Sequence, residues 1–310
     1  MVQRVARIRA KPDCDADYIY HIVGSYLFSQ YLLSELTGTS VPHISAKQIN
    51  GYTFRLPPLP EQRAIADILS TWDEAIALTE QLIVAVGHLK KGLMQQLLTG
   101  QTRFPEFDRE PIEFDRLEDH IDLLAGFAFE SSQFLDEAGI RLLRGTNITS
   151  GSTRWDEGRT QYWPKVSEDF SKYLLELHDV VIGMDGSLVG RNFAMIRESD
   201  LPVLLVQRVA RLRSKNGLSQ LYLFQNIGNS FFTRYVDSRK TVTAIPHISA
   251  NDIKNFEIFL PSLVEQERIA NLLASCDEVV QILTCKHDAL REQKKGLMQQ
   301  LLTGQIRVGV

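Results

Sequence analysis

Three polar loops in the second half of the sequence carry side chains that could hydrogen-bond to nucleic acid. Arg and Lys side chains and backbone N–H groups bind phosphates, and Arg, Asn, Gln, Ser and Thr side chains can reach base edges in the major groove. The candidates are Arg144, Thr146 and Asn147 in the first loop, Asp185, Gly186, Ser187, Arg191 and Asn192 in the second, and Ser238, Arg239, Lys240, Thr241 and Thr243 in the third.

Each loop also has a purely structural explanation. RGTNI at residues 144–148 can be a turn in which Thr and Asn side chains bond to their own backbone. DGSLVG at residues 185–190 can be a solvated hairpin turn, and SRKTVT at residues 238–243 can be surface charge. Only the third loop has a counterpart earlier in the chain, TGTS at residues 37–40, which has no basic residue and should bind phosphates more weakly.

Gln207 and Arg208 are further candidates, and they recur as Gln3 and Arg4, 204 positions earlier. Residues that read different bases should differ between two copies of a unit. The repetition therefore favours a phosphate contact or a role in a shared scaffold.

The sequence lacks the motifs of the enzymes that such loops could belong to. GSLVGR at residues 186–191 lacks the Lys and hydroxyl of a phosphate-binding GxxxxGK loop. There is no Asn-Pro-Pro-aromatic methyltransferase motif, no HExxH and no GxSxG. The seven histidines are scattered, and we expect no catalytic residue and no metal site.

Composition indicates a globular protein of about two domains, with 44% hydrophobic and 23% charged residues. The sequence has no run of about 18 apolar residues, so it predicts no membrane span. It has no apolar segment near the N-terminus, so it predicts no secretory signal. Cys14, Cys276 and Cys285 lack metal-ligand spacing and suit a reducing cytoplasm. The net charge of −4 is unusual for a protein that binds nucleic acid alone, although charge can be local or supplied by a partner.

Two long helices are predicted at residues 60–100 and 264–304, where the run KKGLMQQLLTGQ recurs unchanged after 204 positions. Apolar residues step alternately by four and three, which is the spacing of a coiled-coil seam, although a pair of ordinary core helices would also be amphipathic. We expect the two helices to pack on each other. The seam residues that are candidates for an interface are Ile65, Leu69, Trp72, Ile76, Ile83, Leu93, Leu97, Ile269, Leu273, Val280, Leu283, Leu290, Leu297 and Leu301.

The repeat extends beyond the helices. VQRVARIR at residues 2–9 recurs as VQRVARLR at residues 206–213, and PHISA at residues 42–46 recurs at residues 246–250. Residues 2–106 thus correspond to 206–310, whereas residues from about 110 to 205 have no first copy. We expect one complete unit and the last half of another, through truncation, a start codon assigned too late, or a permuted unit order.

The expected fold class is α/β, with a globular domain of about 150 residues that leads into a long helix. Alternation and turn residues predict the two strands 178–184 and 192–196 as a hairpin. Other strands are expected at residues 2–9, 112–116, 139–149, 204–213 and 256–260, and a helix at residues 219–236.

Together these features resemble the specificity (S) subunits of type I restriction–modification systems, over the whole chain. The most specific marks are LPPLPEQRAI at residues 56–65, echoed by LPSLVEQERI at residues 260–269, and the closing KKGLMQQLLTGQ of both helices. LRGTNI at residues 143–148 and DVVIGMDGSLVG at residues 179–190 are weaker marks. The chain departs from the family pattern because the front half of the first recognition domain is missing.

The resemblance implies two target-recognition domains that are held apart by an antiparallel pair of coiled-coil-like helices. Each domain would read one half of a bipartite site in double-stranded DNA, and the helices would set the spacing. The implied divisions are 1–58 (the C-terminal part of the first domain), 59–100 (first long helix), 101–112 (linker), 113–262 (second, complete domain) and 263–304 (second long helix).

The family also implies partners for a cytoplasmic protein without catalysis of its own. The helices would dock two methyltransferase (M) subunits, and restriction (R) subunits would join the complex. S-adenosylmethionine, Mg²⁺ and ATP would be bound by those partners, and this chain would bind no cofactor and no membrane. The alternative is a truncated scaffold that multimerises through its long helices and no longer reads a bipartite site.

Overall fold

The protein is represented by a computed structural model that describes residues 5–36, 43–165, 168–215, 217–241 and 245–309. The chain divides into two compact units, which we call unit 1 (residues 1–87 and 278–310) and unit 2 (residues 88–277). Helices and mixed sheets together confirm the α/β class. Among the described residues, no helix is long and apolar enough to cross a membrane.

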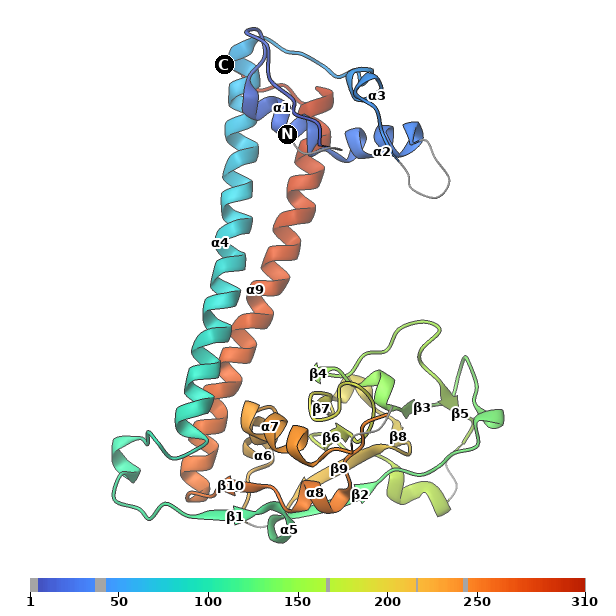
Figure 1. The fold of residues 1–310 in the computed structure, drawn as a ribbon, viewed down its shortest axis with the longest axis vertical. Helices are drawn as coiled ribbons and strands as arrows, with labels where there is room; N and C mark the ends of the chain where they lie inside the picture. Colours follow the sequence, from blue (N-terminus) through green and yellow to red (C-terminus); the bar gives the residue numbers. More distant parts are fainter. Residues whose placement is uncertain (1–4, 37–42, 166–167, 216, 242–244, 310) are drawn as a thin grey trace. The chain divides into compact units, whose positions relative to one another are not determined.

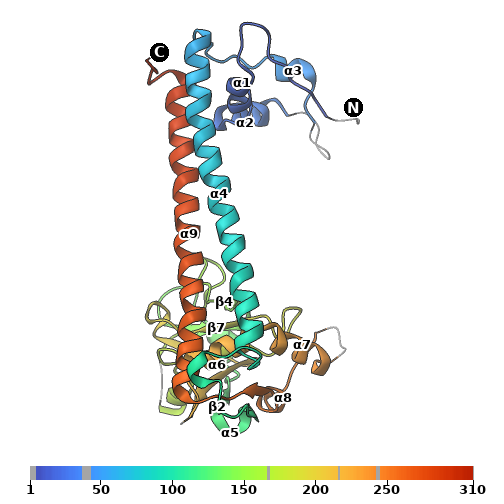
Figure 2. The same ribbon diagram turned by 90° about the vertical axis from the view of Figure 1, so that its left-hand side faces the viewer.

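The two long helices are α4 (Leu59–Leu97) and α9 (Leu263–Thr303), and each contributes to both units. Within each unit their segments lie side by side and antiparallel (Figures 1 and 2). Gly100 and Gly304, with φ of 69° and 71°, follow the two helix ends and can adopt the left-handed backbone found there. The predicted antiparallel helix pair is therefore confirmed.

The predicted seam lies in the contact between the two helices. All fourteen candidate interface residues are buried or half-buried, whereas Leu78 and Leu82 on the flank are exposed. In unit 1, the Lys294 ammonium binds the Asp73 carboxylate across the pair. In unit 2, Lys90 Nζ lies 2.7 Å from Asp277 Oδ2. Lys90 and Asp277 are the repeat counterparts of Lys294 and Asp73, so the lysine lies on α4 here and on α9 in unit 1. These ion pairs fix one antiparallel register in each unit.

The internal repeat is also a repeat of structure. Three helices of unit 1 match three helices of unit 2 residue for residue at an offset of 204. They are α1 (Ala16–Val23), α2 (Tyr26–Glu35) and α3 (Ala46–Asn50), and their counterparts α6 (Gln220–Ile227), α7 (Ser230–Arg239) and α8 (Ala250–Lys254).

The single helix expected at residues 219–236 is wrong, because the chain forms two helices there. Gly228 ends α6, and Asn229 begins α7 with extended backbone and a side chain that accepts the Phe231 N–H. An N-terminal cap of this kind starts a new helix axis. Ser25 caps α2 at the equivalent place in unit 1.

A repeated glutamine explains the EQ dipeptide in the family-like motif. In unit 1 the Gln62 amide accepts the Asp15 N–H at 2.8 Å and donates to the Asp13 and Pro57 carbonyls at 3.1 and 2.8 Å. In unit 2 the Gln266 amide makes the equivalent three bonds, to Ser219 N at 2.9 Å and to the Gly217 and Pro261 carbonyls at 2.9 and 2.8 Å. Each bond joins the start of a long helix to the loops beside it.

A tyrosine supports the same junction in each unit. Tyr222 of α6 is fully buried and donates its hydroxyl to the Phe259 carbonyl at 2.8 Å, and Tyr18 of α1 donates to the Arg55 carbonyl at 2.9 Å. Burial raises the pKa of Tyr18 to about 12. Both hydroxyls therefore remain protonated donors at neutral pH.

One position in this junction differs between the units. His21 of α1 stands where α6 has Gln225, and its side chain is almost fully buried, with Nε2 3.2 Å from Ser70 Oγ and Nδ1 3.8 Å from Asp73 Oδ2. Burial, followed by the charge of Lys294, lowers the pKa of His21 below its ordinary value. The neutral imidazole is the form that unit 1 holds.

We expect His21→Gln to make the stability of unit 1 less sensitive to acid. The folded-state pKa of His21 lies below its unfolded-state pKa, so the unfolded chain takes up the proton first as the pH falls. The contribution of His21 to the wild-type free energy of unfolding is therefore complete above about pH 6.5 and is lost as the pH decreases below it. A glutamine fits this position, since Gln225 reaches Asp277 Oδ2 at 3.4 Å in unit 2. Urea unfolding followed by Trp72 fluorescence at about pH 5 and 7.5 measures the difference, and an unchanged acid-side loss would contradict the prediction.

The described residues of unit 2 form three sheets. Strands β1 (Phe114–Arg116) and β10 (Glu257–Phe259) form an antiparallel pair, and β1 is followed by the short helix α5 (Leu117–His120). A five-stranded sheet has the order β2 (Ile121–Ala125), β9 (Val209–Ser214), β6 (Val180–Gly183), β7 (Phe193–Met195), β4 (Ser150–Gly151), and a three-stranded sheet has the order β5 (Tyr162–Trp163), β3 (Ile140–Leu143), β8 (Val203–Leu205). Short 3₁₀ helices lie at Pro105–Phe107, Ser131–Gln133, Gly145–Asn147, Glu168–Tyr173 and Glu198–Asp200.

The predicted hairpin is confirmed, because β6 and β7 pair antiparallel. The single strand expected at residues 204–213 is wrong. It is split into β8 and β9, which belong to different sheets, at Gln207 and Arg208, and Arg208 has a left-handed backbone with φ of 67°. The strand expected at residues 2–9 is absent from its described part, residues 5–9. Its counterpart β9 pairs with β2 and β6, which have no copy in unit 1.

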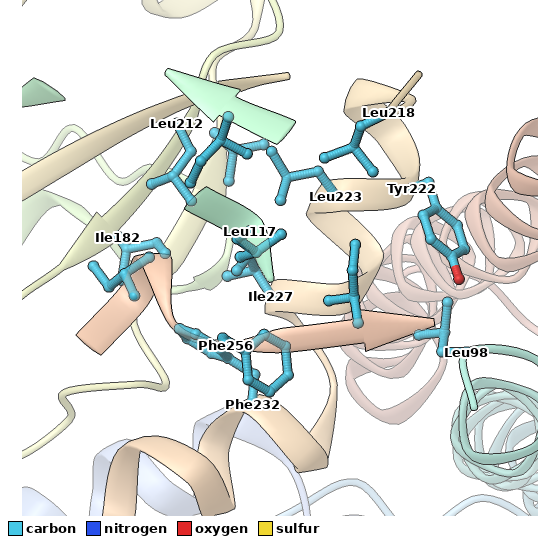
Figure 3. Close-up of a cluster of buried hydrophobic side chains, with 14 of the residues drawn as sticks. Leu98, Leu117, Ile182, Leu212, Leu218, Tyr222, Leu223, Ile227, Phe232 and Phe256 are labelled. Carbon is cyan, nitrogen blue, oxygen red and sulfur yellow. The ribbon is translucent and has the colours of Figure 1, made fainter. Parts of the chain in front are cut away.

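The main core of unit 2 lies between the five-stranded sheet, the helices α6 to α8 and the adjoining ends of α4 and α9 (Figure 3). Ile182, Leu212, Phe232 and Phe256 meet there, and all are at least 90% buried. Val181 faces a second cluster on the opposite side of the sheet. Because both faces of β6 are covered, the strand is a fixed support for the loop that follows it.

Candidate nucleic-acid interface

A hollow of about 630 Å³ in unit 2 brings together residues from separate parts of the chain, and we call it the loop groove. Apart from Ser131, its polar lining comes from the first loop, the second loop and the turn between β8 and β9. The lining residues are Phe129, Ser131, Phe134, Arg144, Gly145, Thr146, Asp185, Gly186, Ser187, Leu188, Asn192, Val206, Gln207 and Arg208.

Strand pairing explains why these segments converge. Strands β3 and β8 are parallel, with Leu143 opposite Leu205, so the turns that follow both strands lie at one end of their sheet. Strands β6 and β9 are antiparallel, with Gly183 opposite Val209, so the loop after β6 meets the turn before β9. The sequence could not show this convergence, because it depends on long-range pairing.

The turn between β8 and β9 is held in place by the second loop. Arg208 is exposed, and its Nη1 lies 2.9 Å from Asp185 Oδ2, while its carbonyl accepts the Met184 N–H at 2.8 Å. A left-handed arginine is sterically unfavourable, so the surrounding contacts must impose this conformation. Gln207 beside it is exposed in the groove. The second loop is itself tied to the chain beyond the third loop, where Gly186 N donates to the Pro246 carbonyl at 3.0 Å.

The first loop contributes fewer free groups than the sequence predicted. Asn147 is fully buried, its Oδ1 accepts the Arg144 N–H at 3.2 Å and its Nδ2 donates to the Arg154 carbonyl at 3.2 Å. Its proposed contact with a ligand is therefore wrong, and the amide stabilises the turn instead. Thr146 is exposed in the groove. Arg144 lines the groove and donates Nη2 to the Arg159 carbonyl at 2.5 Å.

The third loop lies outside the groove lining. Ser238 and Arg239 belong to α7 rather than to a loop. The Ser238 hydroxyl donates to the Tyr235 carbonyl at 2.7 Å, and the exposed Arg239 guanidinium lies 5.4 Å from the centre of the Tyr235 ring. Thr241 Oγ1 accepts the His247 N–H at 3.0 Å. Thr243 lies outside the described residues.

An aspartate that sequence reasoning missed connects the second and third loops. The Arg191 guanidinium makes two bonds to Asp237, at 3.1 and 2.7 Å, and Lys240 Nζ lies 2.7 Å from Asp237 Oδ1. The hydrogen bond from Arg191, followed by that from Lys240, lowers the pKa of Asp237 to about 2. The only sequence signal was the acidic residue immediately before SRK.

Sequence reasoning also missed an aromatic wall. Phe129 is buried beside the groove with its ring centre 4.8 Å from that of Trp163 and 5.1 Å from that of Phe170. The FAF run at residues 127–129 was the available signal. Within the described ranges, no cluster of three His, Cys, Asp or Glu side chains could hold a metal ion.

Unit 2 therefore combines exposed hydrogen-bonding loops, a sheet that is covered on both faces and parts of two repeated long helices. The chain belongs to the family described as the type I restriction modification DNA specificity domain, whose pattern matches residues 1–87 and 109–292.

Curated relatives are specificity subunits. The chain is 30% identical over 307 residues to the type I restriction enzyme MjaVIII specificity subunit of Methanocaldococcus jannaschii, covering 94% of this chain and 71% of that protein. It is 31% identical over 234 residues to the EcoAI specificity subunit of Escherichia coli, covering 74% of this chain and 37% of that protein.

Solved structures show the same fold at low sequence identity. The HsdS subunit from Thermoanaerobacter tengcongensis matches with a TM-score of 0.54 and 19% identity, over 95% of this chain and 71% of that chain. The S subunit from M. genitalium matches with a TM-score of 0.60 and 14% identity, over 94% of this chain and 73% of that chain.

Proposed function

We propose that this chain is a sequence-specific DNA-recognition subunit of a type I restriction–modification complex. The loop groove carries the proposal, because it places hydrogen-bonding side chains from distant segments on one face of unit 2. Thr146, Ser187, Asn192 and Gln207 are groups that can hydrogen-bond to base edges, and Arg144 and Arg208 are groups that can bind phosphates.

We propose a bipartite site, with the two halves read by the two units and the long helices setting their separation. Helices α1 to α3 of unit 1 correspond to helices α6 to α8 of unit 2, which supports a common placement of the two units on DNA. The two units differ where bases would be read, because the segments that form most of the loop groove have no copy in unit 1.

The proposed partners are two methyltransferase subunits and restriction subunits. Those partners would bind S-adenosylmethionine, Mg²⁺ and ATP and perform the chemistry, and this chain would be non-catalytic. The seam residues are occupied by the helix pair of the same chain, so a partner would contact the outward faces of α4 and α9. In unit 1, exposed Leu78 and Leu82 on α4 offer apolar area for that contact.

Methylation mapping tests the proposal directly. The chain would be expressed with its neighbouring modification subunit in cells that lack other methyltransferases, and modified adenines would be located by long-read sequencing. We expect a motif with two separated parts. A motif with one specified half, or with symmetric halves, would assign base reading to unit 2 alone, and no motif from a soluble complex would favour a scaffold that does not read DNA.

A further inference from the structure

Three of the candidate DNA-binding cations of unit 2 are already paired with aspartates of the same chain. Arg191 and Lys240 both bind Asp237, and Arg208 binds Asp185. The side chains of Arg191, Asp237 and Lys240 are 41%, 34% and 29% exposed, so DNA could reach all three. A phosphate that approaches Arg191 or Lys240 must therefore displace a carboxylate.

Contacts other than the Asp237 ion pairs also hold the second loop against α7. Gly190 packs directly on Val236, and a Cβ at residue 190 would lie only 2.7 Å from Val236 Cγ1. Thr233 Oγ1 also donates to the Gly190 carbonyl at 3.2 Å. Because these contacts already position the loop, the carboxylate of Asp237 acts mainly through its charge.

The repeat shows that this cluster is a feature of unit 2 alone. At the positions equivalent to Asp237 and Lys240, unit 1 has Leu33 and Leu36, which are both exposed. The equivalent helix surface therefore forms without an aspartate. Asp237 occurs in the unit that also has the second loop, with Arg191 as its partner.

Neutralised cations change the balance between specific and general DNA binding. Affinity for DNA of any sequence comes mainly from cations that replace the counterions of phosphates. Specificity is the ratio of site affinity to this general affinity. A carboxylate that competes with phosphate lowers general affinity, whereas a matched site can offset the exchange with base contacts.

We propose that Asp237 is a specificity-determining residue that suppresses sequence-independent DNA binding by occupying Arg191 and Lys240. This inference rests on the proposed function, because it assigns the partner as duplex DNA. The expected direction of the effect is definite. Removal of the negative charge should increase the affinity for random DNA more than the affinity for the recognised site.

The test is Asp237→Asn in the full chain, assembled with its modification subunits, on a random-sequence duplex and on a duplex with the mapped motif. Two released cations should steepen the dependence of log Kd on log salt for random DNA by about 2, at about 0.9 per phosphate contact. Random-duplex Kd should fall about tenfold at about 50 mM salt. Adding Arg191→Gln and Lys240→Gln to Asp237→Asn should restore the wild-type slope.

Glu106→Gln is the matched control, because it makes the same charge change and releases Arg268, and neither residue belongs to the three candidate DNA-binding loops. Its slope should equal that of the wild type. An unchanged or weaker affinity of Asp237→Asn for random DNA would overturn the inference, whereas a wild type without preference for the motif would overturn the proposed function instead. If Asp237→Asn unfolds, the double variant Arg191→Gln and Lys240→Gln replaces it. A wild-type dependence of log Kd on log salt for random DNA then supports the inference, and a slope reduced by about 2 overturns it.

Discussion

Glu265→Ala should lower the free energy of unfolding of unit 2 by about 3–5 kcal/mol, because it removes the buried partner of a buried guanidinium and leaves only the half-exposed Glu110 carboxylate, 3.5 Å away. Glu265 is fully buried, and the side chain of Arg103 is only 4% exposed. Arg103 Nε donates to Glu265 Oε1 at 3.0 Å, and its Nη1 donates to the Glu110 carbonyl at 2.6 Å. The hydrogen bond to Glu265 raises the pKa of Arg103, so the arginine stays charged.

The repeat supplies a matched control for this prediction. Glu61 is buried in the same way in unit 1, but its partner Arg307 is 56% exposed. Glu61→Ala leaves that guanidinium in contact with water, so we expect a clearly smaller loss. Urea unfolding followed by Trp155 and Trp163 reports on unit 2, and Trp72 reports on unit 1. Equal losses in the two variants would show that burial of the arginine does not determine the effect.

Gly190→Ala should detach the second loop from α7 and abolish preference for the recognised DNA site. Gly190 has φ of 78°, which costs about 1–2 kcal/mol for a residue with a Cβ. The new methyl group would also lie within 3 Å of Val236 Cγ1 and Cβ. Because the loop carries Ser187 and Asn192 into the groove, its displacement removes candidate base contacts.

Gly158→Ala separates these two causes. Gly158 has φ of 75°, close to that of Gly190, but a Cβ there meets no atom within 4 Å, and the residue does not line the loop groove. It should carry the backbone strain alone and retain site preference. Competition binding with motif and random duplexes measures both variants, and circular dichroism checks that they fold. Similar preference in Gly190→Ala and wild type would mean that the loop does not read the site.

The sequence predicted the features that depend on local pattern. Spacing of about 3.5 residues located α4, α9 and their seam, and alternation around residues 185–190 located the β6–β7 hairpin. The offset of 204 residues anticipated that the two halves would share structure, although it could not show that Gln62 and Gln266 fasten the helix starts.

Features decided by long-range contacts could not be predicted. The chain breaks at Gln207 and Arg208 because β8 and β9 join different sheets. Asn147 looked available for binding, yet its amide is used within its own turn. Asp237 was passed over because its partner Arg191 lies 46 residues away in the chain. The sequence therefore located the loops but could not show which of their charged side chains form ion pairs within the chain.

The repeated hydrogen bonds that hold the starts of α4 and α9 have a genetic consequence. Gln62 and Gln266 bind equivalent atoms, and so do Tyr18 and Tyr222. Runs that encode the same twelve residues, KKGLMQQLLTGQ, stand 204 codons apart and end each long helix. Recombination between such runs would exchange the segment before residue 101 as one block and leave Gln62 and Tyr18 with their partners. Under the proposed function, new combinations of DNA half-sites could then arise without repacking either junction.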